Sequence, residues 1–276
     1  MNLTDVSRTA ILTLRCRVIE SEKDPPLLRD PMARFCLDRL MRWASPEEMP
    51  IFEQPQPTSL TNPMALRARK YDAITSAFIS SHPSSTVVNL GCGFDTRYWR
   101  INHASCRYVE LDLPEMVEIK RAVLGDRLEY ELLGGSVLDP SWIDTVTTGG
   151  NKNILLLAEG LFMYLPRADV IRLFRTVSER LASSQITLEV VKDAYTHGLW
   201  KKIVEQKIRG RLGLDRGVAF EFGVKNAREI ETYGPGIRVI DEWAFVDDPD
   251  CRPRLFRYLG LGRTQWTVTA TINAAA

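Results

Sequence analysis

The stretch VVNLGCGFDTRYWR, residues 87–100, decides the fold of this chain of 276 residues. A short apolar, β-branched run at 86–90 leads directly into Gly91-Cys92-Gly93, and we expect a helix from Asp95 or Thr96. Glycine after a buried strand lets the backbone turn tightly and lets a ligand approach without a Cβ clash. This order of strand and glycine turn is typical of the ligand-binding edge of a parallel sheet.

Strands and helices alternate on both sides of this stretch. The expected strands are 86–90, 106–111, about 128–133, 154–158, 185–191, 237–241 and 264–272, and the expected core helices are 114–124 and 166–181. Repeated alternation predicts a mostly parallel sheet with helices on both faces. The last segment, TQWTVTATI, alternates as an antiparallel, half-exposed strand does. The fold class is therefore α/β, with a seven-stranded, mostly parallel sheet.

The chain divides into four parts of a single expected domain. They are a helical N-terminal cap (1–85), a core (86–191), an insertion that forms a cover (192–236) and C-terminal strands (237–276). In the cap, the second helix is expected to begin at Asp30, since aspartate is a good N-cap and Pro31 suits the first turn. Prolines are dense at 46–63, which indicates a loop or lid before a third helix at 63–80. The insertion is expected to carry a helix at about 199–209.

Composition narrows the function classes. Lysine and arginine number 36 against 35 aspartates and glutamates, and this near neutrality disfavours a nucleic-acid partner. No apolar run is long enough for a membrane span, and the charged first twenty residues lack the apolar core of a secretory signal. The five cysteines are scattered without a C-x-x-C pair. We therefore expect reduced thiols in a cytoplasmic protein without a metal site or a membrane partner, while oligomeric state is not indicated.

An acidic residue stands at the end of the second expected strand. Asp112 lies 19 residues after Gly93, where it is placed to hydrogen-bond the hydroxyls of a ribose. Two simpler interpretations remain open. Gly91 and Gly93 also suit an ordinary tight turn, and Asp112 suits a helix N-cap before Pro114.

The residues after the glycine turn indicate which nucleoside ligand to expect. A dinucleotide site has a third glycine near position 95 or 96, but this chain has Asp95 and Thr96 there. The Asp95 carboxylate would repel a pyrophosphate, so a ligand without phosphate fits better. S-adenosyl-L-methionine has a ribose for Asp112 and an amino-acid end that requires an acidic and a basic neighbour. Asp95 is a candidate for its ammonium group.

Three motifs in order resemble the leucine carboxyl methyltransferase-like family, which includes polyketide O-methyltransferases of the tetracenomycin type. They are VVNLGCGFDTR, YVELDLPEMVEIK (108–120) and LLLAEGLFMYLP (155–166). The resemblance covers 65–190 well and is only general over 192–263. It implies the class I methyltransferase fold and S-adenosyl-L-methionine as methyl donor.

The resemblance also implies a set of cofactor-binding residues. It places Arg67 on the methionine carboxylate, Asp112 on the ribose, and Glu159 in the wall of the site. The full expected set is Arg67, Gly91, Gly93, Asp95, Asp112, Leu113, Ser136, Val137 and Glu159. Ser136-Val137 stands where relatives that methylate proteins carry Asp-Leu beside the adenine, which favours a small-molecule acceptor.

Simpler interpretations stand beside several of these roles. Arg67 belongs to the charged run RARKYD (67–72), and such a run usually marks a solvated helix face. Glu159 also suits a structural role at the end of a strand, and Arg97 is expected to pair with Asp95.

Two residues are candidates for contact with the acceptor. Tyr164 follows the fourth core strand, and His197 lies in the insertion; simpler interpretations are packing for Tyr164 and an ordinary loop residue for His197. Neither is a convincing general base, which favours a carboxylate acceptor that is already ionised at neutral pH. We expect the N-terminal helices, 46–63 and the insertion to form the acceptor pocket.

The sequence therefore predicts an O-methyltransferase that acts on a carboxylate or hydroxyl oxygen of a small, polyketide-like molecule. One alternative is a carboxyl methyltransferase for protein C-termini. Two alternatives from other classes are an NAD-dependent oxidoreductase and a cofactor-binding protein without catalysis, because a fold does not fix the chemistry.

Overall fold

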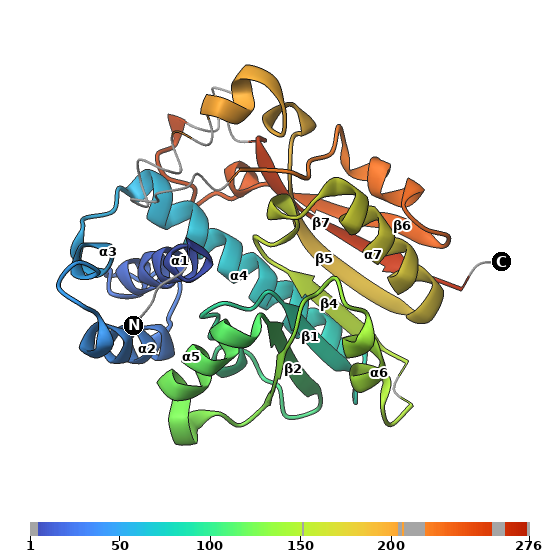
Figure 1. Cartoon of the computed structure of the whole chain (residues 1–276), viewed down its shortest axis with the longest axis horizontal. Helices are drawn as coiled ribbons and strands as arrows, with labels where there is room; N and C mark the ends of the chain where they lie inside the picture. The colour runs from blue at the N-terminus through green and yellow to red at the C-terminus, as the bar shows by residue number, and fades with distance from the viewer. Residues whose placement is uncertain (1–4, 151, 204–205, 207–218, 256–262, 275–276) are drawn as a thin grey trace.

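The computed structural model describes residues 5–150, 152–203, 206, 219–255 and 263–274. These residues form one seven-stranded sheet of order β3-β2-β1-β4-β5-β7-β6 (Figure 1). Its strands are β1 Thr86–Leu90, β2 Arg107–Asp112, β3 Glu131–Gly134, β4 Ile154–Ala158, β5 Ser184–Val191, β6 Ile237–Trp243 and β7 Gln265–Ile272. Strands β1 to β5 pair in parallel, and β7 pairs antiparallel with both β5 and β6. The predicted fold class and the antiparallel direction of the last strand are confirmed, but β7 is largely buried rather than half-exposed because β5 and β6 flank it.

Helices cover both faces of the sheet. The α-helices among the described residues are α1 Asp5–Ser21, α2 Pro31–Trp43, α3 Met49–Glu53, α4 Thr58–Ser81, α5 Pro114–Leu124, α6 Ser141–Thr147 and α7 Arg167–Arg180. Helix α2 begins as predicted, because the Asp30 carboxylate accepts a hydrogen bond from the Ala33 N–H at 3.0 Å. Helices α1, α2 and α3 form a cap beside α4 (Figure 1).

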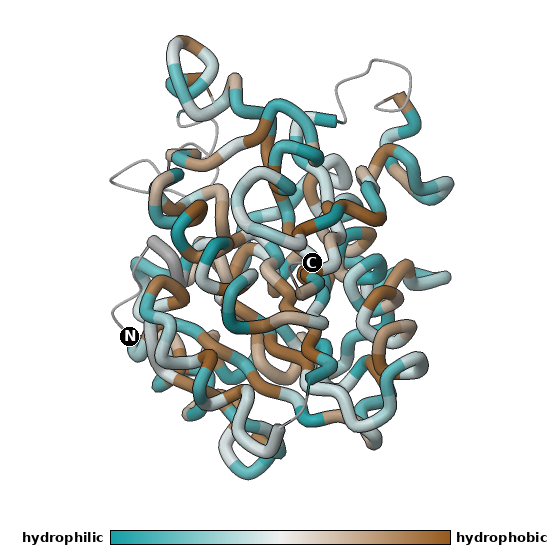
Figure 2. Tube along the Cα trace, turned by 90° about the vertical axis from the view of Figure 1, so that its right-hand side faces the viewer, coloured by the Kyte–Doolittle hydropathy of each residue, from teal (hydrophilic) through white to brown (hydrophobic). Residues whose placement is uncertain are grey.

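The core divides at the sheet because neighbouring side chains of a strand point to opposite faces. Val88 and Leu156 face the layer of α6 and α7, whereas Val87 and Leu155 face α4. Hydrophobic stretches accordingly gather in the middle of the molecule and polar stretches at its periphery (Figure 2). None of the helices in the described ranges is both long and apolar enough to cross a membrane.

The proline-rich segment differs from the prediction. Instead of a loop over 46–63, it contains the short helix α3, and α4 begins at Thr58 with Pro63 inside it. A tertiary contact holds this first part of α4: the Asn62 side chain donates to the Asp250 carbonyl at 3.0 Å and accepts from the Arg252 N–H at 2.6 Å. Contacts with a segment nearly 190 residues away therefore override the local effect of the proline.

The helix expected from Asp95 or Thr96 is also absent. One 3₁₀ turn, Arg97–Trp99, stands there, and long-range ion pairs draw Arg97 inward to Asp72 at 2.9 Å and Glu159 at 2.7 Å. In the insertion, residues 198–203 and 206 are helical, and the remainder of the helix expected at 199–209 lies outside the described residues.

Candidate functional site

A cavity of about 330 Å³ opens at the edge of the sheet where the parallel strands end. The chain runs from β1 to β2 on one side and returns to β4 on the other, so the order of the strands reverses between β1 and β4. Ligands of open α/β sheets bind at such a switch point, beyond the carboxyl ends of the strands. The volume is at the lower end of the usual range for small-molecule pockets.

The cavity brings together every cofactor-binding residue that the sequence predicts. Its wall includes Arg67 of α4, the glycine turn after β1, the end of β2, the segment after β3 and the end of β4. The predicted residues that line it are Arg67, Gly91, Gly93, Asp95, Asp112, Leu113, Ser136, Val137, Glu159 and Tyr164.

The glycine turn requires glycine for two reasons. Gly91 and Gly93 have φ angles of +63° and +47°, which residues with a side chain rarely adopt. A Cβ atom at Gly91 would lie 2.7 Å from Leu161 Cδ1, and one at Gly93 would lie 3.2 Å from Ala10 Cβ. The turn thus packs directly against α1 and the segment after β4, and its backbone forms part of the cavity wall.

Asp112 joins the end of β2 to this turn. One carboxylate oxygen accepts the Gly93 N–H at 2.7 Å, and the other accepts the Leu113 N–H at 2.7 Å. Burial raises the pKa of Asp112, and these two N–H groups partly oppose that shift. A carboxylate has about four lone-pair positions, so acceptor capacity remains for a ligand that enters the cavity.

Arg67 is buried rather than solvated. Its Nε donates to Glu159 at 2.8 Å and its Nη1 donates to Glu189 of β5 at 2.8 Å. No acceptor among the described residues pairs with Nη2. Arg67 lines the cavity, so its guanidinium group is placed to meet an anionic ligand group there.

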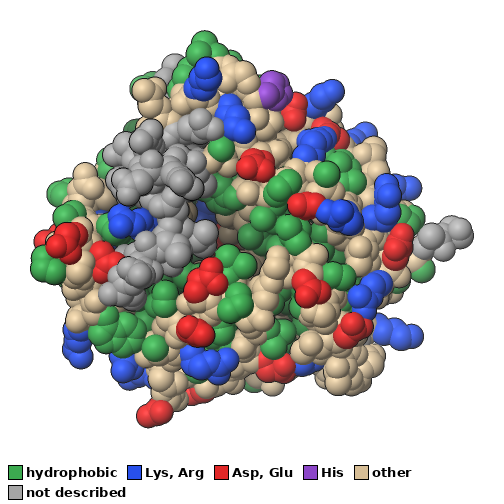
Figure 3. Space-filling view, in the orientation of Figure 1, with side chains coloured by type: hydrophobic (Ala, Val, Ile, Leu, Met, Phe, Trp, Pro, Cys, Tyr) green, Lys and Arg blue, Asp and Glu red, His purple; other side chains and the backbone are tan. Residues whose placement is uncertain are grey.

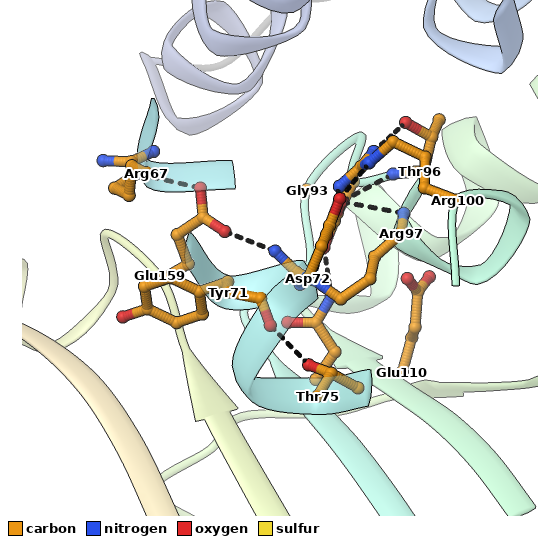
Figure 4. Close-up of polar contacts among 12 residues, drawn as sticks. Arg67, Tyr71, Asp72, Thr75, Gly93, Thr96, Arg97, Arg100, Glu110 and Glu159 are labelled. Atoms are coloured by element: carbon orange, nitrogen blue, oxygen red, sulfur yellow. Dashed lines mark hydrogen bonds and ion pairs between the residues drawn. The ribbon is translucent and has the colours of Figure 1, made fainter. Parts of the chain in front are cut away.

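Glu159 connects Arg67 to a second buried arginine. It lies between Arg67 and Arg97 in Figure 4, and Arg97 Nη2 donates to it at 2.7 Å. Arg97 also pairs with Asp72 at 2.9 Å and with Asp95, so its predicted pairing with Asp95 is confirmed. Burial opposes the ionised form of Glu159, but Arg67 and Arg97 hold its pKa below the ordinary value.

The Asp95 carboxylate makes more hydrogen bonds and ion pairs than the sequence suggested. It accepts from Asn89 at 2.9 Å and from two backbone N–H groups, and it pairs with Arg97 and with Arg100 at 3.3 Å. Burial opposes ionisation of Asp95, but Arg97 and Arg100 lower its pKa far below the ordinary value. Its position therefore favours a role in fixing the glycine turn over direct capture of an ammonium group.

The chemistry of these groups fits S-adenosyl-L-methionine. An acidic acceptor at the end of β2 suits a ribose, and an arginine nitrogen without a described partner suits a carboxylate. A pyrophosphate would meet the Asp95 carboxylate, as the sequence predicts.

The two candidates for acceptor contact occupy different places. Tyr164 lines the cavity at the end of the 3₁₀ turn Phe162–Tyr164, and burial raises its pKa to about 12. The side chain of His197 is 65% exposed and is absent from the cavity wall. Of the segments expected to form the acceptor pocket, helix α1 lines this cavity, whereas 46–63 and the described part of 192–236 do not.

Sequence reasoning missed much of the remaining wall. Helix α1 contributes Thr9, Ala10, Thr13 and Arg17, and the segment after β4 contributes Leu161, Met163 and Leu165. Gln265 of β7 completes the set. Hydrophobic side chains also gather beside the hollow in the middle of the face shown in Figure 3. Among these residues, only the segment after β4 lay within a motif that the sequence singled out.

Comparison with known proteins agrees with this geometry. A sequence model of the leucine carboxyl methyltransferase family matches residues 10–178. The tetracenomycin polyketide synthesis O-methyltransferase TcmP of Streptomyces glaucescens is 29% identical over 269 residues, which cover 95% of this chain and 92% of TcmP. The S-adenosyl-L-methionine-dependent methyltransferase dpfgK of Gibberella zeae is 23% identical over 285 residues, covering all of this chain and 91% of dpfgK.

Solved structures share the fold. A Thermobifida fusca protein designated a methyltransferase has a TM-score of 0.54 at 15% identity, with 94% of each chain covered. A protein of the DUF574 family from Streptomyces avermitilis has a TM-score of 0.53 at 14% identity, with 94% of this chain and 96% of that chain covered. The two likenesses support the class I methyltransferase fold.

Proposed function

The chain belongs to the leucine carboxyl methyltransferase family, and we propose that it methylates an oxygen atom of a small, polyketide-like acceptor. It is a methyltransferase that depends on S-adenosyl-L-methionine. One observation carries the finer proposal: the cavity wall next to the cofactor residues is largely apolar and offers no free base. Each carboxylate that lines the cavity is already hydrogen bonded, and no histidine stands among the described residues that line it.

The proposed cofactor site assigns one role to each group. Asp112 accepts the ribose hydroxyls, and Nη2 of Arg67 donates to the methionine carboxylate. Glu159 faces the ammonium and sulfonium charges, with Asp95 behind it as the anchor of the glycine turn. Ser136 and Val137 lie beside the adenine, where they offer backbone groups and an apolar surface rather than a carboxylate.

The proposed methyl transfer depends more on alignment of the acceptor oxygen with the methyl group than on general acid–base catalysis. When bound, S-adenosyl-L-methionine supplies an electrophilic methyl group at its sulfonium sulfur. The wall formed by Leu161, Met163 and Leu165 holds the acceptor and excludes water. Orientation of this kind can account for about 7–11 kcal/mol of a barrier. A carboxylic acid of pKa near 4 is ionised at neutral pH and requires no base, so we favour a carboxylate over a phenol.

Of the two candidates for acceptor contact, Tyr164 and His197, we favour Tyr164. Because its pKa is raised to about 12, its hydroxyl is protonated at neutral pH and can donate a hydrogen bond but cannot remove a proton. We propose that it orients the acceptor oxygen. This role requires an acceptor that arrives already deprotonated.

Substitution of His197 by alanine is expected to change kcat/KM by less than about twofold, because an exposed side chain outside the cavity contributes little. The measurement is methyl transfer from labelled S-adenosyl-L-methionine at saturating and limiting acceptor. A fall in kcat of tenfold or more with unchanged cofactor affinity would instead place His197 at the reacting atoms.

The acceptor class is tested with labelled donor and a panel of aromatic carboxylic acids, phenols and peptides with free C-termini. We expect the aromatic acids to be methylated, with kcat/KM independent of pH between 6 and 8, since an acid of pKa about 4 is fully ionised there. Preference for phenols, with a rate that rises with pH, would overturn the carboxylate proposal. Preference for peptides would support methylation of protein C-termini.

A further inference from the structure

A carboxylate outside the cavity wall contacts the key arginine of the cofactor site. Glu189 belongs to β5 and is 4% exposed, and its Oε2 accepts from Arg67 Nη1 at 2.8 Å. The two residues are 122 positions apart in the sequence. Glu189 is not among the residues that line the cavity, so it acts on a ligand only through the cavity residues that it contacts, Arg67 first among them.

The strand fixes where Glu189 points. Leu188 and Val190 belong to the core on the α6–α7 face, so Glu189 points to the α4 side of the sheet. A side-chain hydrogen bond from Gln265 also reaches it. Burial raises the pKa of Glu189, while Arg67 opposes that shift. Its acceptor oxygen is therefore held in place by a rigid strand and by two neighbouring elements.

Two nitrogens of Arg67 bind carboxylates of the protein, and the third is left for a ligand. Glu159 accepts from Nε and Glu189 accepts from Nη1, which fixes the plane of the guanidinium. Gly160 lies against this group, since a Cβ atom there would be 3.6 Å from Nη1 and 3.8 Å from Nη2. With two nitrogens fixed and a glycine beside them, the orientation of Nη2 is determined.

We propose that Glu189 is a positioning residue for cofactor binding: it holds Arg67 so that Nη2 faces the carboxylate of the bound amino-acid group. The proposal rests on the role of Arg67 given under Proposed function. It assigns Glu189 an effect on one part of the ligand, the carboxylate, and none on the ribose or the adenine.

Three ligands separate this role from a general structural one. S-adenosyl-L-methionine has the carboxylate, decarboxylated S-adenosylmethionine lacks only that group, and 5′-methylthioadenosine lacks the whole amino-acid end. Calorimetry without any acceptor measures their dissociation constants, so the result does not depend on which acceptor the enzyme uses. If the wild-type protein bound the first two equally, the proposed role of Arg67 would itself be wrong.

Glu189→Ala is expected to weaken binding of S-adenosyl-L-methionine about tenfold, because Arg67 loses one of the two hydrogen bonds that orient it and its bond to the ligand carboxylate is weakened. The same variant should change binding of the other two ligands less than about twofold. Glu189→Gln keeps an oxygen acceptor of the same reach and should bind within about threefold of the wild type. The exposed Glu179→Ala on α7 is the matched control and should bind all three ligands normally.

Glu189→Asp supplies a second comparison if the alanine variant does not fold. It retains the charge but shortens the side chain by one methylene, so the carboxylate no longer reaches Nη1. We expect it to bind S-adenosyl-L-methionine more weakly than Glu189→Gln does. Equal loss for all three ligands, no loss for any, or tighter binding by the aspartate than by the glutamine variant would overturn the proposal.

Discussion

Replacing Asp112 by alanine is expected to weaken binding of S-adenosyl-L-methionine by at least about 100-fold, because a hydrogen bond to a charged group contributes about 1.5–3 kcal/mol and a ribose offers two hydroxyls. The substitution also removes the acceptor for the Gly93 N–H, which loosens the turn that forms the adjacent wall. Both effects act in the same direction. Calorimetric titration with S-adenosyl-L-methionine measures the sum.

Two further comparisons isolate the ribose contribution. Asp112→Asn keeps an oxygen acceptor of similar size and should lose about tenfold, since the charge is gone but one hydrogen bond remains. Asp126→Ala, an exposed aspartate after α5, should have no effect. Wild-type protein should discriminate against the 2′-deoxy analogue of the donor, and Asp112→Ala should not. Binding by Asp112→Ala within threefold of the wild type would exclude Asp112 as the ribose acceptor.

The parts of the fold that were predicted correctly depend on short-range signals. Strands β1 and β4 have the bounds that their continuous apolar runs indicate, and α5 begins at Pro114, where proline suits the first helical turn. The spacing of Asp112 from Gly93 predicted that both line one cavity, because parallel strands end at the same edge. Such features need no knowledge of distant contacts.

The incorrect predictions share a cause in long-range contacts. The helix expected after Asp95 is replaced by a 3₁₀ turn that carries Arg97 inward to Asp72 and Glu159, residues of α4 and of the end of β4. Glu189 gave no signal at all, because TLEVV reads as an apolar strand and its partner lies in α4. A buried charged residue can be recognised only when the oppositely charged partner that it contacts in the fold is known.

The second large effect is expected from substitution of Arg97, the buried arginine after the glycine turn. Arg97 is fully buried and contacts the three carboxylates of Asp72, Asp95 and Glu159. Removing one partner of a buried ion pair costs about 3–5 kcal/mol, because the remaining charge is left without compensation. Arg97→Met is therefore expected to lower the melting temperature by about 10 °C at pH 7. The exposed Arg172→Met, which breaks a surface pair with Asp169, should lower it by less than about 2 °C.

The dependence on pH distinguishes lost charge from lost packing. In the wild type, burial opposes ionisation of Asp95 and Glu159, but Arg97 and the neighbouring arginines lower the pKa of both groups. Their contribution to stability is therefore present above the ordinary carboxylate pKa and is lost as pH falls from there through the lowered pKa values. Without Arg97, the same buried carboxylates favour protonation, and acid relieves the variant. The difference in unfolding free energy between the two proteins should therefore shrink from pH 7 to pH 4.5. A difference that is constant over this range would assign the effect of Arg97 to packing rather than to its charge.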